Sequence, residues 1–353
     1  MLFVYPIEAT AENWLHDCLY EILCSIHASL QTTKTLPEWP DIIPEPYRKR
    51  LHKRKALESK LNTYRKNLEK LTIDEQERIL QALHDQNKIA LLLSCQLNCE
   101  AISDLPQRIR KPVKKLFEYA FDILTDMEIR DKHYKVIYDK VPYHICPFCG
   151  CEYFDAPGAP REALDHYLAE SKYPFAASNL RNLVPMGTKC NSRYKLAKDI
   201  LTRDDGTRRQ SFDPYNHTGV RISLENSQPF IGTDEKLPQW NIEFDPDTEE
   251  TTTWDEVFDI RKRYIRDILD PSFNRWLDNF GDLFRKNFGN SPITDQAIVQ
   301  GIRQHCEDLE LMKLTGQDFL RYLVFQMLYK QCHSGNQRLI NLIRDVVNKV
   351  QTP

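Results

Sequence analysis

The sequence predicts a mainly α-helical protein with a small α+β insert near its middle. Apolar residues recur at helical spacing through the first part of the chain and again from about residue 254 onward. Between these regions lie a run of short motifs and two stretches in which apolar and polar residues alternate, as in half-buried strands. We therefore expect an N-terminal helical domain over residues 1–130, a motif-bearing domain over 131–210, and a β-hairpin with a helical bundle over 211–353.

The N-terminal part is expected to consist of helices. The first 30 residues carry apolar side chains at helical spacing, and four prolines then mark an irregular connection: Pro37, Pro40, Pro44 and Pro46. A narrow apolar seam predicts one long charged helix over residues 47–70. Thr72 and Glu75 have the spacing of a capping box, which predicts the start of the next helix. A further helix is expected to follow Pro112.

The C-terminal part is expected to begin with two antiparallel strands. Apolar and polar residues alternate around 220–224 and again around 240–244. Thr253 and Glu256 have capping-box spacing, so the chain should turn helical there. The helices are expected near residues 254–269, 272–287, 294–312, 316–332 and 336–349.

Composition indicates an ordinary soluble globular protein, with 41% hydrophobic and 28% charged residues. The net charge of −3 does not indicate nucleic-acid binding, so any affinity for phosphate must come from local basic clusters. The start of the chain lacks a basic region and meets Pro6 at once, which is unlike a signal peptide. Ten cysteines without an export signal favour a reducing, cytoplasmic location, and no membrane insertion is expected.

The residues with the most chemical information lie within about fifty positions. They are Cys146-Pro-Phe-Cys149-Gly150, Leu164-Asp165-His166-Tyr167, Asn182-Leu-Val-Pro185 and Cys190-Asn191-Ser-Arg-Tyr-Lys195. Phosphodiester cleavage needs an activated water, a cation and positioning. The carboxylate of Asp165 and the amide oxygen of Asn191 are suitable ligands for Mg²⁺ or Mn²⁺. His166 can accept a proton from water, so activity should fall when it is protonated, near a reference pKa of about 6.5.

In this order, the segments resemble the HNH endonuclease family. The resemblance covers about residues 140–200 and implies a ββα-metal fold, hydrolysis of DNA and a 5′-phosphate product. In that family a histidine preceded by aspartate is the general base, a middle asparagine orients the loop through backbone hydrogen bonds, and the last motif residue binds the metal. The matching positions here are Asp165 with His166, then Asn182, then Asn191.

The cysteines of this region resemble an incomplete zinc knuckle. The usual second Cys-x-x-Cys pair would fall at positions 187 and 190, but position 187 is glycine. Structural zinc prefers four ligands. The candidate ligands are Cys146, Cys149 and Cys190, with Cys151 or His144 as a fourth. The alternative, in which these thiols pack together in reduced form without metal, stays open.

Lys195, Lys172 and Arg193 are candidate contacts to DNA phosphates. The chain as a whole resembles the HNH effectors of anti-phage defence systems of Septu-like or Zorya-like type. That resemblance implies a separately encoded ATPase or membrane complex as a partner. Two other functions stay open: a catalytically idle zinc-type module that binds nucleic acid or scaffolds a partner, and an RNA-directed nuclease with the same site.

Overall fold

The computed structural model describes residues 1–32, 35–159, 164–196, 198–229, 238–289, 293–311 and 317–349, with Phe288 described by its backbone alone. The chain forms two compact units. The N-terminal unit contains Phe3–His144 and Phe154–Thr218. The C-terminal unit contains Met1–Leu2, Ile145–Tyr153 and Gly219–Pro353. The motif-bearing residues 154–218 thus share a unit with the N-terminal helices; the predicted three-domain division stays a prediction.

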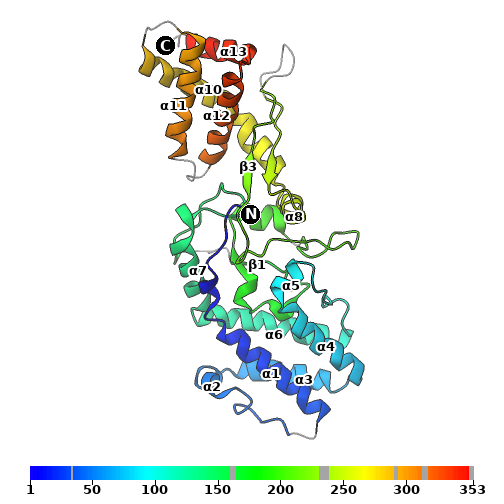
Figure 1. The fold of residues 1–353 in the computed structure, drawn as a ribbon. Helices are drawn as coiled ribbons and strands as arrows, with labels where there is room; N and C mark the ends of the chain where they lie inside the picture. The colour runs from blue at the N-terminus through cyan, green and yellow to red at the C-terminus, as the bar shows by residue number, and fades with distance from the viewer. Residues whose placement is uncertain are drawn as a thin grey trace. The chain divides into compact units, whose positions relative to one another are not determined.

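The protein is mainly helical, as the sequence predicts, and the N-terminal unit is built on a set of packed helices (Figure 1). These are α1 (Trp14–Gln31), α2 (Glu45–Leu51), α3 (Lys55–Leu68), α4 (Ile73–Gln86), α5 (Ile89–Leu93), α6 (Gln107–Asp126) and α7 (Ile129–Lys140). The apolar faces of all of these helices except α5 contribute to one buried core, in which Ile22 of α1, Leu61 of α3 and Leu116 of α6 are almost fully excluded from solvent. Burial of these faces supplies the main stabilisation of the unit.

The expected long helix over residues 47–70 is wrong, because the chain breaks into α2 and α3. Arg54 leaves the helical region with φ −84° and ψ 76°, and the carbonyl of His52 accepts a hydrogen bond from the Trp39 indole at 3.0 Å. The capping box of Thr72 and Glu75 is confirmed at the start of α4.

The prediction that a helix follows Pro112 is also wrong, since Pro112 lies inside α6. The helix begins earlier, after Pro106, whose extended backbone precedes the first turn. Pro112 lacks an amide hydrogen and so forfeits one helical hydrogen bond, but it is buried in the unit's core face. Packing of that face outweighs the lost bond.

The small α+β part of the N-terminal unit is anchored in the helical core. Strands β1 (Leu164–His166) and β2 (Leu183–Pro185) pair antiparallel, and Phe175, Ala177, Leu180 and Leu183, from the connection between the strands and the start of β2, belong to the same buried cluster as the helices. Hydrogen bonds fix this connection further. Gln86 accepts from the Phe175 amide at 3.1 Å, and Asn13 accepts from the Leu180 amide at 2.8 Å.

The C-terminal unit contains the second sheet and the remaining helices. Strands β3 (Arg221–Ser223) and β4 (Glu243–Asp245) pair antiparallel, as predicted, with Ile222 opposite Phe244 and both buried. The helical elements are α8 (Glu249–Phe258), α9 (Ile260–Arg263), the π-helix η6 (Tyr264–Leu269), α10 (Asp270–Phe288), α11 (Asp295–Glu310), α12 (Asp318–His333) and α13 (Gln337–Asn348).

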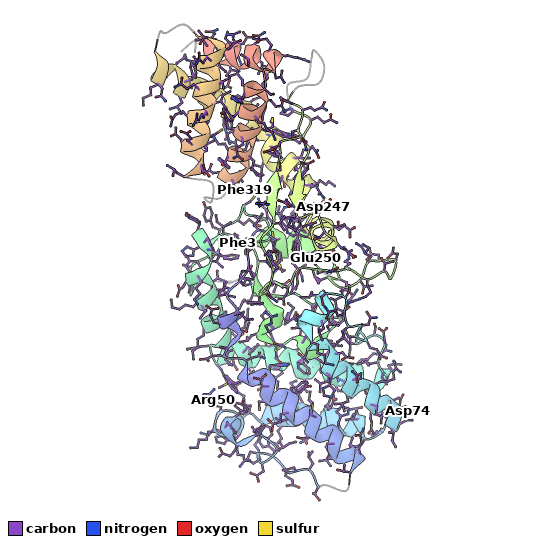
Figure 2. The ribbon with its side chains drawn as sticks, viewed as in Figure 1. Phe3, Arg50, Asp74, Asp247, Glu250 and Phe319 are labelled. Atoms are coloured by element: carbon purple, nitrogen blue, oxygen red, sulfur yellow. The ribbon has the colours of Figure 1, made fainter. Side chains whose placement is uncertain are left out.

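The first helix of this bundle starts earlier than predicted. The capping residue of α8 is Thr248, whose hydroxyl accepts from the Thr251 amide, and not Thr253, which lies buried within the helix. Figure 2 labels Asp247 and Glu250, two of the carboxylates at this helix start. Acidic side chains there interact favourably with the helix dipole.

None of the described helices is both long and apolar enough to cross a membrane.

Candidate active site

The β1–β2 hairpin carries the predicted Asp-His pair. In its register Asp165 lies opposite Val184 and His166 lies opposite Leu183. Leu183 and Val184 are fully buried, whereas Asp165 and His166 are half-buried. The hydrophobic strand β2 therefore holds β1 against the core and leaves its polar pair partly accessible.

Asn182 ties the connection between the two strands together. Its side-chain oxygen accepts from the Leu168 amide at 2.7 Å, and its nitrogen donates to the carbonyls of Leu168 at 3.1 Å and Ala176 at 3.2 Å. Asn182 is completely buried, so these hydrogen bonds replace those that its amide would make with water. These three bonds hold the connection between β1 and β2 against the residue that precedes β2.

His166 is held in one orientation and one tautomer. Its Nε2 lies 2.9 Å from the carbonyl oxygen of Ala177, which can only accept, so Nε2 carries the proton in the neutral ring. The Phe121 ring of α6 packs on the imidazole, with ring centroids 4.6 Å apart. Burial lowers the pKa of His166 to about 4. The imidazole is therefore neutral at physiological pH, with a lone pair on Nδ1.

Asp165 is joined to Lys195, a residue predicted to contact phosphate. Lys195 Nζ donates to Asp165 Oδ2 at 2.7 Å and to the backbone carbonyl of His166 at 2.8 Å. The lysine is 1% exposed, so its ammonium group points into the site and away from solvent. Lys195 thus links both residues of the Asp-His pair to the segment of the chain on which the lysine itself lies.

That segment is η5 (Cys190–Lys195), a single π-helical turn. π-Helical turns are rare and occur frequently at functional sites. Asn191 lies about one turn before Lys195, half-buried, and its carbonyl accepts from the Leu196 amide at 3.0 Å. Because Lys195 contacts Asp165, this turn is held against the strand that carries the Asp-His pair. Among the residues that the structure describes, no hydrogen bond joins Asn191 to Asp165.

The donor set is compatible with a hard divalent cation. One carboxylate oxygen of Asp165 is used by Lys195, which leaves Oδ1 and the Asn191 amide oxygen as oxygen donors. Mg²⁺ commonly takes one or two carboxylates and keeps several waters. The ammonium of Lys195 already neutralises part of the Asp165 charge, so the affinity of this site for a cation should be modest.

The other two predicted DNA contacts are both exposed, but Lys172 is paired with a carboxylate. Lys172 donates to the buried Asp199 at 3.1 Å, and the Tyr173 hydroxyl donates to the same oxygen at 2.8 Å. Arg193 on η5 is exposed. Arg193 is thus more accessible to a phosphate than Lys195. A phosphate bound to Lys172 would compete with the carboxylate of Asp199 for the lysine's positive charge.

Three of the predicted zinc ligands come together. The sulfur atoms of Cys146, Cys149 and Cys190 lie within 4.8 Å of one another, and all three residues are buried, so this group could hold a metal ion. Cys151 is not part of the group, and its Sγ lies 3.0 Å from the Cys149 carbonyl. His144, the other candidate for a fourth ligand, stacks on Tyr138 and has its Nδ1 2.8 Å from that residue's carbonyl.

Sequence reasoning missed two residues that contact the His166 ring. Phe121 lies on α6, and nothing in the sequence pairs that helix with the motif. Glu170, four residues after His166, places Oε2 at 3.8 Å from His166 Nδ1. A spacing of four in a loop has no fixed geometry, so no sequence signal indicated this approach.

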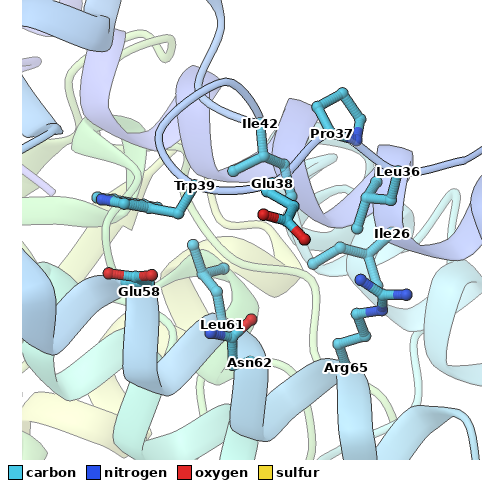
Figure 3. A pocket seen from close by; sticks show the side chains of 10 residues that line it. All are labelled: Ile26, Leu36, Pro37, Glu38, Trp39, Ile42, Glu58, Leu61, Asn62 and Arg65. Atoms are coloured by element: carbon cyan, nitrogen blue, oxygen red, sulfur yellow. The ribbon is translucent and has the colours of Figure 1, made fainter.

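A separate pocket of about 220 Å³ lies between α3 and the loop before α2 (Figure 3). Trp39 and Glu38 from the loop face Glu58 and Arg65 of α3 across it. Glu58 pairs with Lys55 at 3.0 Å and Arg65 with Glu69 at 2.8 Å, so both charges of α3 are already compensated. This pocket contributes none of the predicted site residues.

Comparison with family models, curated proteins and solved structures gives no match to this chain.

Proposed function

We propose that this protein is a metal-dependent endonuclease of the HNH, ββα-metal type that hydrolyses phosphodiester bonds in DNA. The observation that carries the proposal is the state of His166. A backbone carbonyl fixes its tautomer, an aromatic ring fixes its plane, and burial keeps it neutral. A neutral imidazole that keeps a lone pair on Nδ1 can accept a proton, as a general base must.

The proposed roles follow the positions of the side chains. His166 Nδ1 takes a proton from the attacking water. Asn182 keeps the connection between the strands in shape and thereby holds the Ala177 carbonyl against His166 Nε2. Asp165 and Asn191 would hold Mg²⁺ or Mn²⁺, and a bound cation would stabilise charge on the phosphate and the leaving oxygen. Lys195 holds the Asp165 carboxylate in place.

A structural zinc ion at Cys146, Cys149 and Cys190 is part of the proposal. Buried thiols this close together form a favourable zinc site once deprotonated, with a fourth ligand still to be identified. Its role would be to fix the start of η5, and with it Asn191, and not to take part in cleavage.

The biological context we propose is that of a DNA-cleaving effector in anti-phage defence, acting with a separately encoded ATPase or membrane complex. It rests on the resemblance of the chain to the effectors of such systems. Arg193, which is exposed on η5, supports a DNA path beside the site. Isolation of the protein with its native partners would test this part of the proposal.

The proposal is tested with purified protein and supercoiled plasmid, in Mg²⁺ or Mn²⁺, with and without EDTA. The variants are His166→Ala and, as a matched control, His333→Ala, which removes an exposed histidine of α12. We expect divalent-dependent nicking by wild type and H333A and none by H166A. DNA binding without cleavage would favour the idle module, and cleavage of structured RNA alone would favour the RNA-directed nuclease.

A further inference from the structure

Glu170 lies beside the free nitrogen of His166. Its Oε2 is 3.8 Å from Nδ1, too long for a direct hydrogen bond. The other carboxylate oxygen, Oε1, is buried and has no hydrogen-bond partner among the residues that the structure describes. The Glu170 side chain is 30% exposed and that of His166 11%, so both side chains are partly accessible to solvent.

The facing atoms of the two side chains are both acceptors. Nε2 of His166 carries the ring proton because it donates to the Ala177 carbonyl, which leaves only a lone pair on Nδ1. The carboxylate of Glu170 has no proton to offer when ionised. Two hydrogen-bond acceptors at this distance repel each other unless a group with two hydrogen-bond donors lies between them and donates to both. Water is the smallest such group.

The surroundings of Glu170 include charges from α6. Burial raises its pKa, and the negative charges of Glu118 and Asp122 raise it further, whereas Lys114 lowers it. Around His166 the charged neighbours are Asp165, Lys195 and Arg130. The region between the two side chains is therefore bordered by both signs of charge. Among the residues that the structure describes, neither side chain forms a close ion pair.

We propose that Glu170 is a catalytic residue that orients the attacking water together with His166. This inference rests on the proposed nuclease function and adds a residue that the HNH-like motif does not include. A water that contacts both Nδ1 and Oε2 at about 2.8 Å would have an angle of about 85° between the two contacts. Both of its protons would then be directed toward protein acceptors, and a lone pair would be left for phosphorus.

The reaction step balances with these groups. One water proton passes to His166 Nδ1 while the oxygen forms a bond to phosphorus. The bond between phosphorus and the 3′ oxygen breaks, and that oxygen takes a proton from solvent. Glu170 accepts a hydrogen bond from the second water proton throughout and keeps its own charge state. Its contribution is orientation, for which misplacement by about 1 Å costs on the order of 100-fold in rate.

The test uses the full chain and four proteins: wild type, Glu170→Ala, Glu170→Asp and the control Glu118→Ala. Glu118 is an exposed carboxylate on α6 that lies near Glu170 but has no role in the proposed step. Nicking rates give kcat and KM, thermal melting reports folding, and fluorescence anisotropy in EDTA reports DNA binding. Sodium formate is added to E170A to supply a small carboxylate in place of the missing side chain.

We expect E170A to lose about 100-fold in kcat, with KM, melting temperature and DNA binding unchanged, and formate to restore part of the loss. E118A should stay within about twofold of wild type. If E170A has a lower melting temperature than wild type, E170D is the deciding variant, because it retracts the carboxylate without removing it. A decrease of about 10-fold or more in the kcat of E170D supports the inference. A wild-type kcat in E170D overturns it.

The failures can be told apart. Wild-type kcat in a folded E170A, beside an inactive H166A, would overturn the role of Glu170 and leave the nuclease proposal intact. No cleavage of DNA or RNA by wild type in Mg²⁺ or Mn²⁺ would remove the proposed function, and this inference with it.

Discussion

Lys195 Nζ lies 2.7 Å from Asp165 Oδ2, and the lysine is 1% exposed. A buried ammonium group is costly unless it is paired and hydrogen-bonded. Here Lys195 Nζ also donates a second hydrogen bond, to the His166 carbonyl. The ion pair thus fixes η5 to β1 at the position where the proposed general base and the proposed cation ligand meet.

Lys195→Met is therefore expected to destabilise the protein. The substitution leaves Asp165 without its partner in a half-buried position, and we expect a loss of about 2–3 kcal/mol in the free energy of unfolding, measured by urea denaturation. Lys70→Met, which changes an exposed lysine, should stay within about 0.5 kcal/mol of wild type. Equal stability of the two variants would show that the pair contributes nothing.

Asn182→Ala should destabilise the protein and abolish cleavage together. It removes three hydrogen bonds and leaves the Leu168 amide and the Leu168 carbonyl unsatisfied in a buried site, which corresponds to about 2–4 kcal/mol; the Ala176 carbonyl keeps its bond from the Asn179 amide. Urea denaturation and plasmid nicking test the two effects. Asn62→Ala, at an exposed position of α3, serves as the control and should change neither. A stable and active N182A protein would contradict the loop-orienting role.

The pH dependence of nicking should differ from that of an ordinary histidine. The base must be neutral, and burial lowers the pKa of His166 to about 4. Activity limited by this residue is expected to persist as the pH falls through 6.5 and to decline only toward pH 4. Initial nicking rates between pH 7.5 and the acid limit of folding test this. A half-maximal rate near pH 6.5 would mean that His166 is hydrated or is not the base.

Stability should fall in mild acid for a reason separate from catalysis. Burial lowers the pKa values of His16, His27, His166 and His305 to about 4. Unfolding exposes these rings and returns them to a pKa of about 6.5. Between those values the unfolded chain binds more protons, so stability rises with pH and is lost as the pH drops from 6.5 toward 4.

At pH 5 each fully buried histidine should cost about 1–2 kcal/mol relative to pH 7. Urea denaturation at pH 7 and pH 5 measures the sum, and His305→Phe should reduce the difference, because His305 packs between the apolar rings of Phe280 and Phe325. Equal stability at both pH values would contradict the buried, neutral state of these residues.

Metal analysis tests the cysteine group. We expect about one zinc per chain in protein purified without chelator, and less in Cys190→Ser. Cys332→Ser, which changes a buried cysteine of α12 outside the group, is the control and should keep its zinc. Wild-type protein free of zinc, yet folded and active, would favour the packed, reduced thiols.

The sequence indicated the local elements of the site better than their packing. The capping box at Thr72 and the strands β3 and β4 could be predicted, because capping and alternation are local patterns, whereas the strand position of Asp165 and His166 was expected only from the resemblance. The burial of Lys195 and the approach of Phe121 to His166 could not, because both depend on how distant segments pack. The predicted start of the helix at Pro112 was wrong, because burial of the helix face that contains Pro112 outweighs the loss of one helical hydrogen bond.

The most direct test of the central claim is the rate of plasmid nicking by wild type, H166A and H333A in Mn²⁺, with melting temperatures recorded for all three. We predict divalent-dependent nicking by wild type and H333A, and a loss of at least about 100-fold in H166A at an unchanged melting temperature. Nicking by folded H166A at the wild-type rate would contradict the assignment of His166 as the base that activates water.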